Sequence, residues 1–234
     1  MQEYYTNYEK NKNRSSRHSD IRQFCYLCGI RFDDKVKKQR EHVIPKFLIG
    51  NKHPLILSAC NGCNKCKGYI EDRLNLTFGI YSHNDNKYPA SLAIKTIESN
   101  VKDGKMGHIK EVFSNTKKEY IKDKSGIYFP QPVHTKSIKN DPNIRVFFYN
   151  ITKGLHTYYE DRIINWELID IKTVDIWSKW NKEIDINQIT DPNSQYEIWE
   201  GVFKYERSCY IYSTVYKFHV YSQFGATIEI KTTK

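Results

Sequence analysis

The stretches that decide the fold are FCYLCGIRF at residues 24–32 and ACNGCNKCKG at residues 59–68. Each contains a Cys-x-x-Cys pair, and 31 residues separate the two pairs. Two such pairs can supply four thiolates in tetrahedral geometry, which is the arrangement of a closed structural zinc site. The spacing therefore predicts one structural Zn²⁺ with four sulfur ligands: Cys25, Cys28, Cys60 and Cys63.

Two further cysteines complicate this assignment. Cys66 forms an equally good Cys-x-x-Cys pair with Cys63, so the sequence leaves open whether Cys66 replaces Cys63 as a zinc ligand. Otherwise Cys66 and the isolated Cys209 are interpreted as partly buried free thiols. A disulfide framework is not expected, because the chain is long and its start does not resemble a secretory signal.

The composition is that of a folded, basic protein. Its 234 residues are 39% hydrophobic and 14% aromatic, which excludes an acidic disordered chain. No stretch approaches the roughly 18 apolar residues of a membrane helix, so a cytoplasmic protein without a membrane partner is expected. The net charge is +10, and residues 1–86 carry six of the excess positive charges. Such a charge attracts nucleic acid, although lysine-rich usage can equally reflect an AT-rich genome.

The pattern along the chain predicts a two-part α+β architecture. Its expected parts are a flexible basic arm at residues 1–23, a cysteine-rich module at 24–84 and a larger mixed α+β C-terminal domain at 85–234. Helices are expected after Cys63 and at three other places: residues 90–104, 143–158 and 173–184. Residues 196–230 are dense in aromatic and β-branched residues, and they predict that the C-terminal domain ends in paired antiparallel strands.

A second motif lies between the two Cys pairs. It reads Arg40-Glu41-His42-Val43-Ile44-Pro45, and Asn64 and Lys67-Gly68 follow the second pair. An acidic residue before His, a Pro three residues later and a Cys-Asn-x-x-Lys-Gly segment opening a helix together resemble the HNH endonucleases. Zinc-bearing members of this family, also called the ββα-metal or His-Me finger group, carry two Cys pairs around that core. The resemblance covers about residues 24–80, a third of the chain.

The resemblance implies a metal-dependent endonuclease that hydrolyses phosphodiester bonds. It implies that His42 is the general base that deprotonates the attacking water, since an imidazole titrates close to working pH. It also implies that Glu41 and Asn64 hold a catalytic divalent metal, Mg²⁺ or Mn²⁺, which neutralises the phosphorane. Because Glu41 and His42 are neighbours on an expected strand, both side chains reach one site only if the backbone bulges there.

Five other residues near the motif are weaker candidates for a role in the site. Lys67 is able to contact a phosphate and Glu71 to add a metal ligand, but both are interpreted as charges on a solvated helix surface. Asn51 is the candidate for the family's middle Asn, which supports the loop of the catalytic His and has no clear counterpart here. His53 and His83 are weaker candidates for a ligand role.

The sequence therefore favours an enzyme that cuts nucleic acid, with double-stranded DNA as the expected substrate and restriction or anti-phage defence as the expected setting. Two alternatives stay open: a non-catalytic zinc-knuckle nucleic-acid-binding protein, and an RNase of the same fold. Glu41, His42 and Asn64 favour catalysis, because a purely zinc-binding module does not need them. Residues 85–234 match no motif, and target recognition or formation of a homodimer is expected there from size alone.

Overall fold

The structure is a computed structural model that describes residues 16–17, 21–49, 55–81, 87–104, 106–107, 109–110, 116–122, 125–134, 141–164, 166–176, 195–199, 203–220 and 224–231. Its elements are β1 (Ser16–Arg17), η1 (Ile21–Gln23), β2 (Lys38–His42), α2 (Lys46–Ile49), β3 (Ile56–Cys60), α3 (Asn61–Tyr81), α4 (Lys87–Lys102), β4 (Thr116–Lys122), β5 (Tyr128–His134), α6 (Pro142–Glu160), β6 (Arg162–Ile163), η3 (Trp166–Leu168), β7 (Ile169–Ile176), β8 (Gln195–Trp199), β9 (Phe203–Cys209), β10 (Ser213–Val220) and β11 (Phe224–Lys231). The protein is thus mixed α+β with antiparallel strand pairs, which confirms the expected class. No described helix is both long and apolar enough to cross a membrane.

The chain divides into two compact units. The first contains Met1–Glu71 and Pro142–Lys234, and the second contains Asp72–Asp141. The boundary expected at residue 84 falls among residues 82–86, outside the described part of the chain, and the division into a 24–84 module and an 85–234 domain stays a prediction. Most of the arm expected at residues 1–23 also lies outside the described residues.

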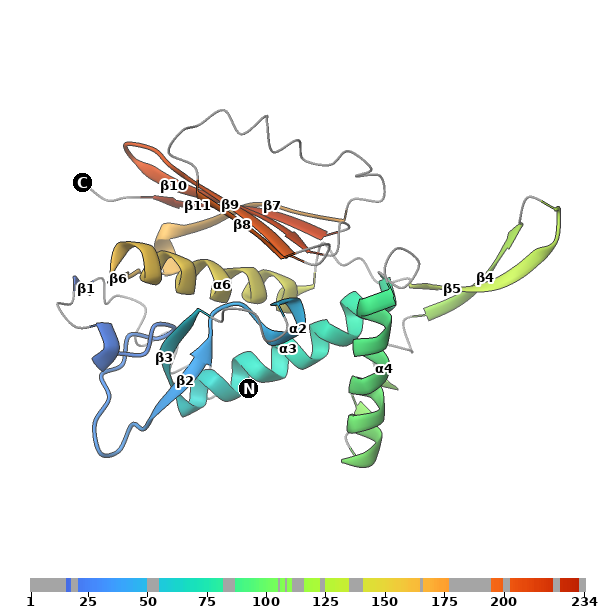
Figure 1. Ribbon diagram of the computed structural model, residues 1–234, viewed down its shortest axis with the longest axis horizontal. Coiled ribbons are helices and arrows are strands. Elements are labelled where there is room, and N and C mark those ends of the chain that lie inside the picture. The colour runs from blue at the N-terminus through green and yellow to red at the C-terminus, as the bar shows by residue number, and fades with distance from the viewer. Residues whose placement is uncertain are drawn as a thin grey trace. The chain divides into compact units, whose positions relative to one another are not determined.

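A five-stranded antiparallel sheet belongs to the first unit and has the order β7-β11-β10-β9-β8 (Figure 1). Buried and partly exposed side chains alternate along much of β9 and β10, so one face of the sheet is turned toward the core. That face carries five buried aromatic residues: Phe203, Tyr205, Tyr216, Phe218 and Phe224. The antiparallel strands expected over residues 196–230 are therefore confirmed.

The helix expected over residues 173–184 is wrong in its described part. Residues up to Ile176 belong to strand β7, which pairs with β11. The segment from Thr173 to Ile176 is rich in β-branched residues, which favour a strand when a partner is available. Only the tertiary fold brings β11 alongside this segment, and residues 177–184 lie outside the described part.

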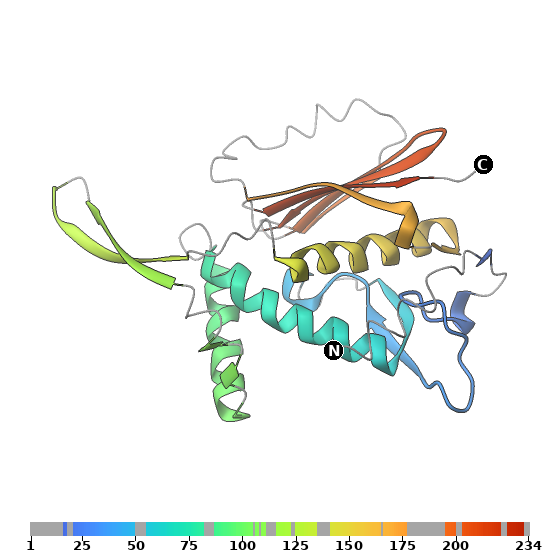
Figure 2. The same cartoon turned by 180° about the vertical axis from the view of Figure 1, so that it is seen from behind.

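Helix α6 is buried on more than one side. Seven consecutive residues, 151–157, are all buried, which is typical of a helix inside a core rather than on a surface. Figures 1 and 2 show α6 between the five-stranded sheet and the β2–β3 pair. Its Phe148 lies 5.6 Å from Phe218 of β10 between ring centroids, and its Phe147 stacks on Phe47 of α2 at 6.2 Å. Helix α6 therefore joins the two layers of the first unit.

Strands β2 and β3 form their own two-stranded antiparallel sheet. The register pairs Lys38 with Cys60 and His42 with Ile56, without a shift between these ends. Helix α3 follows β3 directly and begins at Asn61. The helix expected after Cys63 is confirmed, and the first unit contains β2, β3 and the first part of α3, up to Glu71.

The second unit has a small core of its own. Leu76 and Ile109 are buried together, with Ile97 of α4 packed against them. The Asn75 side chain donates a hydrogen bond to the Thr96 hydroxyl at 2.7 Å. Helix α4 is followed by Gly104 at φ +69°, a left-handed conformation that favours glycine and confirms the expected end of this helix.

Gly154 of α6 marks a close approach to the segment that follows β2. A Cβ placed on Gly154 would lie 2.4 Å from Cγ1 of Val43 and 3.1 Å from the Tyr26 ring. Val43 and Tyr26 are both buried, so neither side chain can swing into solvent. No side chain larger than hydrogen therefore fits at this position without moving its neighbours.

We predict that Gly154→Ala lowers the free energy of unfolding. Alanine gains about 1 kcal/mol of helix propensity over glycine, but overpacking a tight core costs about 1–3 kcal/mol, and both Cγ atoms of Val43 lie within 3 Å of the new methyl. Denaturant unfolding followed by circular dichroism measures the net change. Gly68→Ala on α3 is the matched control, because nothing lies within 4 Å of its Cβ position, and it should stabilise the protein. A Gly154→Ala variant at least as stable as the wild type contradicts the prediction.

Candidate metal centre and catalytic strand

The two Cys-x-x-Cys pairs come together at one place. The candidate ligand atoms of Cys25, Cys28, Cys60 and Cys63 all lie within 4.8 Å of one another. The sulfurs of Cys28 and Cys60 are 3.9 Å apart, and all six cysteines of the chain are free of disulfides. Four thiolates at this spacing could bind a metal ion such as zinc.

The backbone around the first pair is a tight turn. The Gly29 amide donates to the Cys25 carbonyl at 2.7 Å, and the Cys25 amide donates to the Ile30 carbonyl at 2.9 Å. Gly29 has φ +71°, as expected for the residue after the pair, and this conformation favours glycine because it has no Cβ. The turn aims the sulfurs of Cys25 and Cys28 to the same side.

The second pair bridges a strand end and a helix start. Cys60 is the last residue of β3, and Cys63 lies in the first turn of α3. The Cys63 amide donates to the Cys60 sulfur at 3.4 Å, so an otherwise unpaired amide of the helix start supports a candidate ligand atom. The structure brings Cys63 into the cluster and leaves Cys66 outside it.

The electrostatics of the four thiols reflect their crowding. Hydrogen bonding with Cys25 lowers the pKa of the Cys60 thiol far below its usual range and raises the pKa values of Cys28 and Cys63. The cause is that sulfurs this close cannot all carry negative charge without a cation among them. A divalent metal removes this conflict, so the donor set fits zinc.

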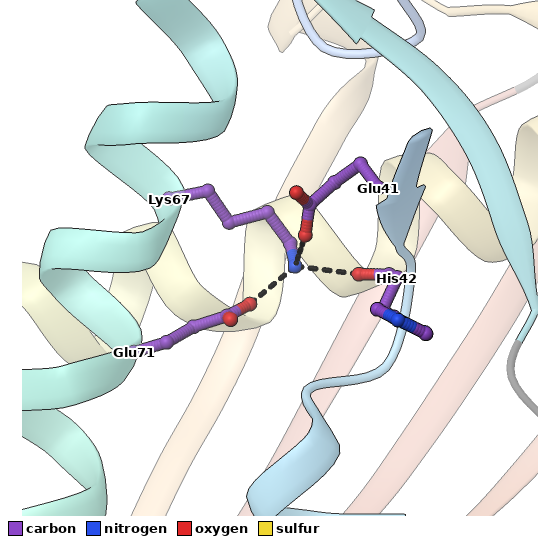
Figure 3. Close-up of polar contacts among 4 residues, drawn as sticks. All are labelled: Glu41, His42, Lys67 and Glu71. Carbon is purple, nitrogen blue, oxygen red and sulfur yellow. Dashed lines mark hydrogen bonds and ion pairs between the residues drawn. The ribbon is translucent and has the colours of Figure 1, made fainter. Parts of the chain in front are cut away.

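A buried lysine joins strand β2 to helix α3. The Lys67 ammonium donates to Oε1 of Glu41 at 2.8 Å, to the main-chain oxygen of His42 at 2.6 Å and to Oε1 of Glu71 (Figure 3). The Lys67 side chain is only 2% exposed. Three acceptors are what an ammonium needs when it leaves water, since it has three N–H donors. We call Lys67, Glu41 and Glu71 the Lys67 cluster.

The interpretation of Lys67 and Glu71 as solvated surface charges is wrong. Lys67 is buried, and Glu71 is a partner of its ion pair. The four-residue spacing of Lys67 and Glu71 on a helix was a local signal for this pair. The contact with Glu41 had no local signal, because Glu41 and Lys67 are 26 positions apart in the sequence.

The structure places the two motif residues of β2 on different sides. Glu41 reaches toward Lys67, whereas Figure 3 shows the His42 imidazole pointing away from the Lys67 cluster. The regular pairing of β2 with β3 explains this, because neighbouring residues of a strand face opposite ways. The backbone bulge expected at Glu41 and His42 is absent from this strand pairing.

The His42 imidazole is half-buried, and its Nδ1 has no hydrogen-bond partner among the described residues. Burial lowers the pKa of His42, and the charge of Lys46 lowers it further. Both effects favour the neutral imidazole, which is the form that can accept a proton. Asn64 is half-buried on α3, and in the described part of the chain no hydrogen bond or ion pair links it to Glu41 or His42.

The segment around His42 is basic. Five exposed side chains that form no ion pair with any described residue lie within residues 35–46: Lys35, Lys37, Lys38, Arg40 and Lys46. Unpaired basic side chains of this kind attract phosphate groups. The weaker candidates Asn51, His53 and His83 lie outside the described residues.

One buried residue near the cysteines was missed by the sequence reasoning. Lys153 of α6 donates a hydrogen bond to the Leu27 carbonyl at 2.5 Å, inside the first Cys-x-x-Cys turn. The available signal was a lysine beside a glycine in the middle of an expected helix, at residues 151–156. Sequence periodicity alone does not tell such a lysine from a surface one.

Comparison of the chain with models of known protein families, with curated proteins and with solved structures finds no match. The site's own geometry therefore carries the functional argument.

We predict that Lys67→Met destabilises the protein strongly. The substitution leaves the carboxylates of Glu41 and Glu71 close together without their cation, and breaking a buried ion pair by removing one partner costs about 3–5 kcal/mol. Glu71→Gln should cost less, because an amide oxygen still accepts from the ammonium. Equilibrium unfolding in urea, with zinc present, measures both variants.

The matched control is Lys65→Met, since Lys65 is exposed on the same helix. It should change the stability by less than about 0.5 kcal/mol. Equal effects of Lys65→Met and Lys67→Met would show that the Lys67 cluster does not hold the strand to the helix.

Proposed function

We propose that this protein is a metal-dependent HNH endonuclease that hydrolyses phosphodiester bonds, with DNA as its substrate. One observation carries the proposal: a β2–β3 pair bearing Glu41 and His42 leads directly into α3 bearing Asn64, and four cysteines cluster from the turn before β2 and from the junction of β3 and α3. The order and type of these parts agree with the motif resemblance. A simple zinc-binding knuckle has no need of His42 beside a buried carboxylate.

In this proposal the four cysteines hold a structural zinc ion. The zinc ties the 25–28 turn to the junction of β3 and α3, as a closed site of four thiolates does. Because the ligands come from two separate segments, the metal fixes the ends of the β2–β3 pair relative to the helix. The cytoplasm is the proposed compartment, since thiols stay reduced there and available to a metal.

His42 is the proposed general base. Its neutral imidazole would take a proton from the attacking water, while the main-chain oxygen of the same residue stays bonded to Lys67. Glu41 and Asn64 are the proposed ligands of a second ion, Mg²⁺ or Mn²⁺, which would neutralise the phosphate charge that develops during attack. Glu41 keeps one oxygen on Lys67, and a carboxylate has a second oxygen to offer a metal.

The opposite orientations of Glu41 and His42 bear on these roles. The main chain at His42 is held by Lys67 on the side of Glu41, so the imidazole and the carboxylate lie on the two sides of one strand. A phosphate group bound at the edge of β2 would have to reach both the imidazole and the carboxylate. His42 is the more exposed of the two residues, and so it is the first candidate for a direct role.

We predict that His42→Ala lowers the cleavage rate by about 10²-fold or more, the usual size of a general-base contribution. The assay incubates full-length protein with supercoiled plasmid DNA and, in parallel, with a structured RNA, in Mg²⁺ or in Mn²⁺. His219→Ala is the matched control, because His219 is a half-buried histidine on β10 of the large sheet. Its activity should equal that of the wild type.

Cleavage by His42→Ala at the wild-type rate would exclude His42 as the base. Binding of DNA without any metal-dependent cleavage by the wild type would favour the alternative of a non-catalytic zinc-knuckle protein. Cleavage of RNA but not of DNA would favour the RNase alternative.

We also predict that the basic segment contacts the phosphates that flank the cut. A triple variant Lys35→Gln, Lys37→Gln and Lys38→Gln in the His42→Ala background should bind a fluorescein-labelled DNA duplex more weakly. The slope of log K against log salt concentration should flatten by up to about 0.9 for each phosphate that the variant no longer neutralises. Fluorescence anisotropy over a series of salt concentrations measures the slope.

The control for charge alone is a second triple variant in the same background, with glutamine at Lys95, Lys102 and Lys110. These lysines are exposed and lie in the second unit. An equal loss of affinity in both triple variants would show a general effect of net charge, and the basic segment would then have no special role.

A further inference from the structure

Lys153 carries a positive group into the interior of the first unit. The residue is only 5% exposed and lies in the stretch of α6 that is buried all round. Its ammonium donates to the Leu27 carbonyl, between Cys25 and Cys28. In the part of the chain that the structure describes, no carboxylate pairs with Lys153.

A buried ammonium needs a counter-charge. Lysine is almost never fully buried unless it is paired, because the cost of removing its charge from water is large. One carbonyl oxygen offers a hydrogen bond but no net negative charge. The carbonyl that the ammonium contacts lies between Cys25 and Cys28, so the sulfurs of the cysteine cluster are the groups that can supply negative charge near Lys153.

The missing charge follows from the chemistry of the cysteine cluster. Four thiolates around one divalent zinc leave a net charge of minus two on a site whose ligands are largely buried. Such a site is itself costly to bury without a neighbouring cation. The ammonium and the metal centre therefore each supply the charge that the other lacks.

We propose that Lys153 is the counter-ion of the anionic metal centre, and that helix α6 is in this way an integral part of the centre. Lys153 acts as a positioning residue: it holds the Leu27 carbonyl and so the first Cys-x-x-Cys turn, and its charge offsets the net negative charge of four thiolates around zinc. Gly154 supports this placement, because the missing side chain lets α6 come close to Tyr26 of the same turn. The proposal depends on metal binding by the four cysteines and not on nuclease activity.

The test is the zinc affinity of full-length Lys153→Met, in which a side chain of similar length lacks the charge and the donor. Competition with a chromophoric chelator gives the affinity, and elemental analysis gives the content. The wild type should bind one zinc per chain. Lys153→Met should bind it about 10- to 100-fold more weakly, the usual effect of removing an outer partner of a metal ligand.

Two variants separate this role from simple packing. Thr152→Val alters the neighbouring buried residue, whose hydroxyl bonds to Phe148 within the helix, and it should keep the wild-type zinc affinity. Lys153→Arg keeps the charge and should bind zinc more tightly than Lys153→Met. Cobalt substitution adds a signature, because the sulfur-to-cobalt charge-transfer band reports whether all four thiolates still bind in each variant.

The outcomes are distinct. Wild-type zinc affinity in Lys153→Met, or an equal loss in Thr152→Val, overturns the proposal. If neither Lys153→Met nor Lys153→Arg folds in excess zinc, Lys153 serves packing and the proposal is rejected. A wild type that binds no zinc would reject the metal centre itself, whereas loss of His42-dependent cleavage alone would leave the role of Lys153 standing.

Discussion

Helix α6 lies so close to the segment after β2 that no side chain fits at Gly154. This approach determines much of the first unit, because the same helix supports the large sheet through Phe148 and the candidate site through its other side. Val43, which meets Gly154, directly follows His42. The position of the candidate base therefore depends on a helix more than 100 residues later in the chain. Dense packing of this kind transmits small shifts, since a core has few voids to absorb them.

Two buried lysines, one on α3 and one on α6, contact the elements of the candidate site. Lys67 forms ion pairs with Glu41 and Glu71 and donates a hydrogen bond to the main chain of His42, so it links β2 to α3. Lys153 bonds the turn that carries the first cysteine pair. Burial of either ammonium alone would be unfavourable, and each is tolerated because its surroundings supply hydrogen-bond acceptors or negative charge. Placing both in the interior makes the strand, the helix and the cysteine cluster dependent on one another.

Several features of the fold could be predicted from the sequence. The four clustered cysteines, the glycine after the first pair, helices α3, α4 and α6 and the aromatic strands all follow local patterns of spacing or periodicity. Two predictions are wrong because they depend on a distant part of the chain. Residues from Thr173 to Ile176 form a strand because β11 lies beside them, and a helical pattern in the sequence does not reveal a distant partner. Lys67 was interpreted as a solvated residue because burial of a charge depends on acceptors from another element.

The sequence by itself determined the four cysteines that could bind a metal and the motif residues Glu41, His42 and Asn64, because these follow from residue type and short-range spacing. Only the tertiary structure decided that Cys63 rather than Cys66 joins the cluster and that Lys67 forms an ion pair with Glu41. It also decided that the imidazole of His42 points away from the Lys67 cluster. The first two depend on where the strand pair meets helix α3, which is set by long-range packing and by the pairing of buried charges, and no local pattern encodes that meeting. The third depends on the regular pairing of β2 with β3, which leaves no bulge to turn both side chains to one side.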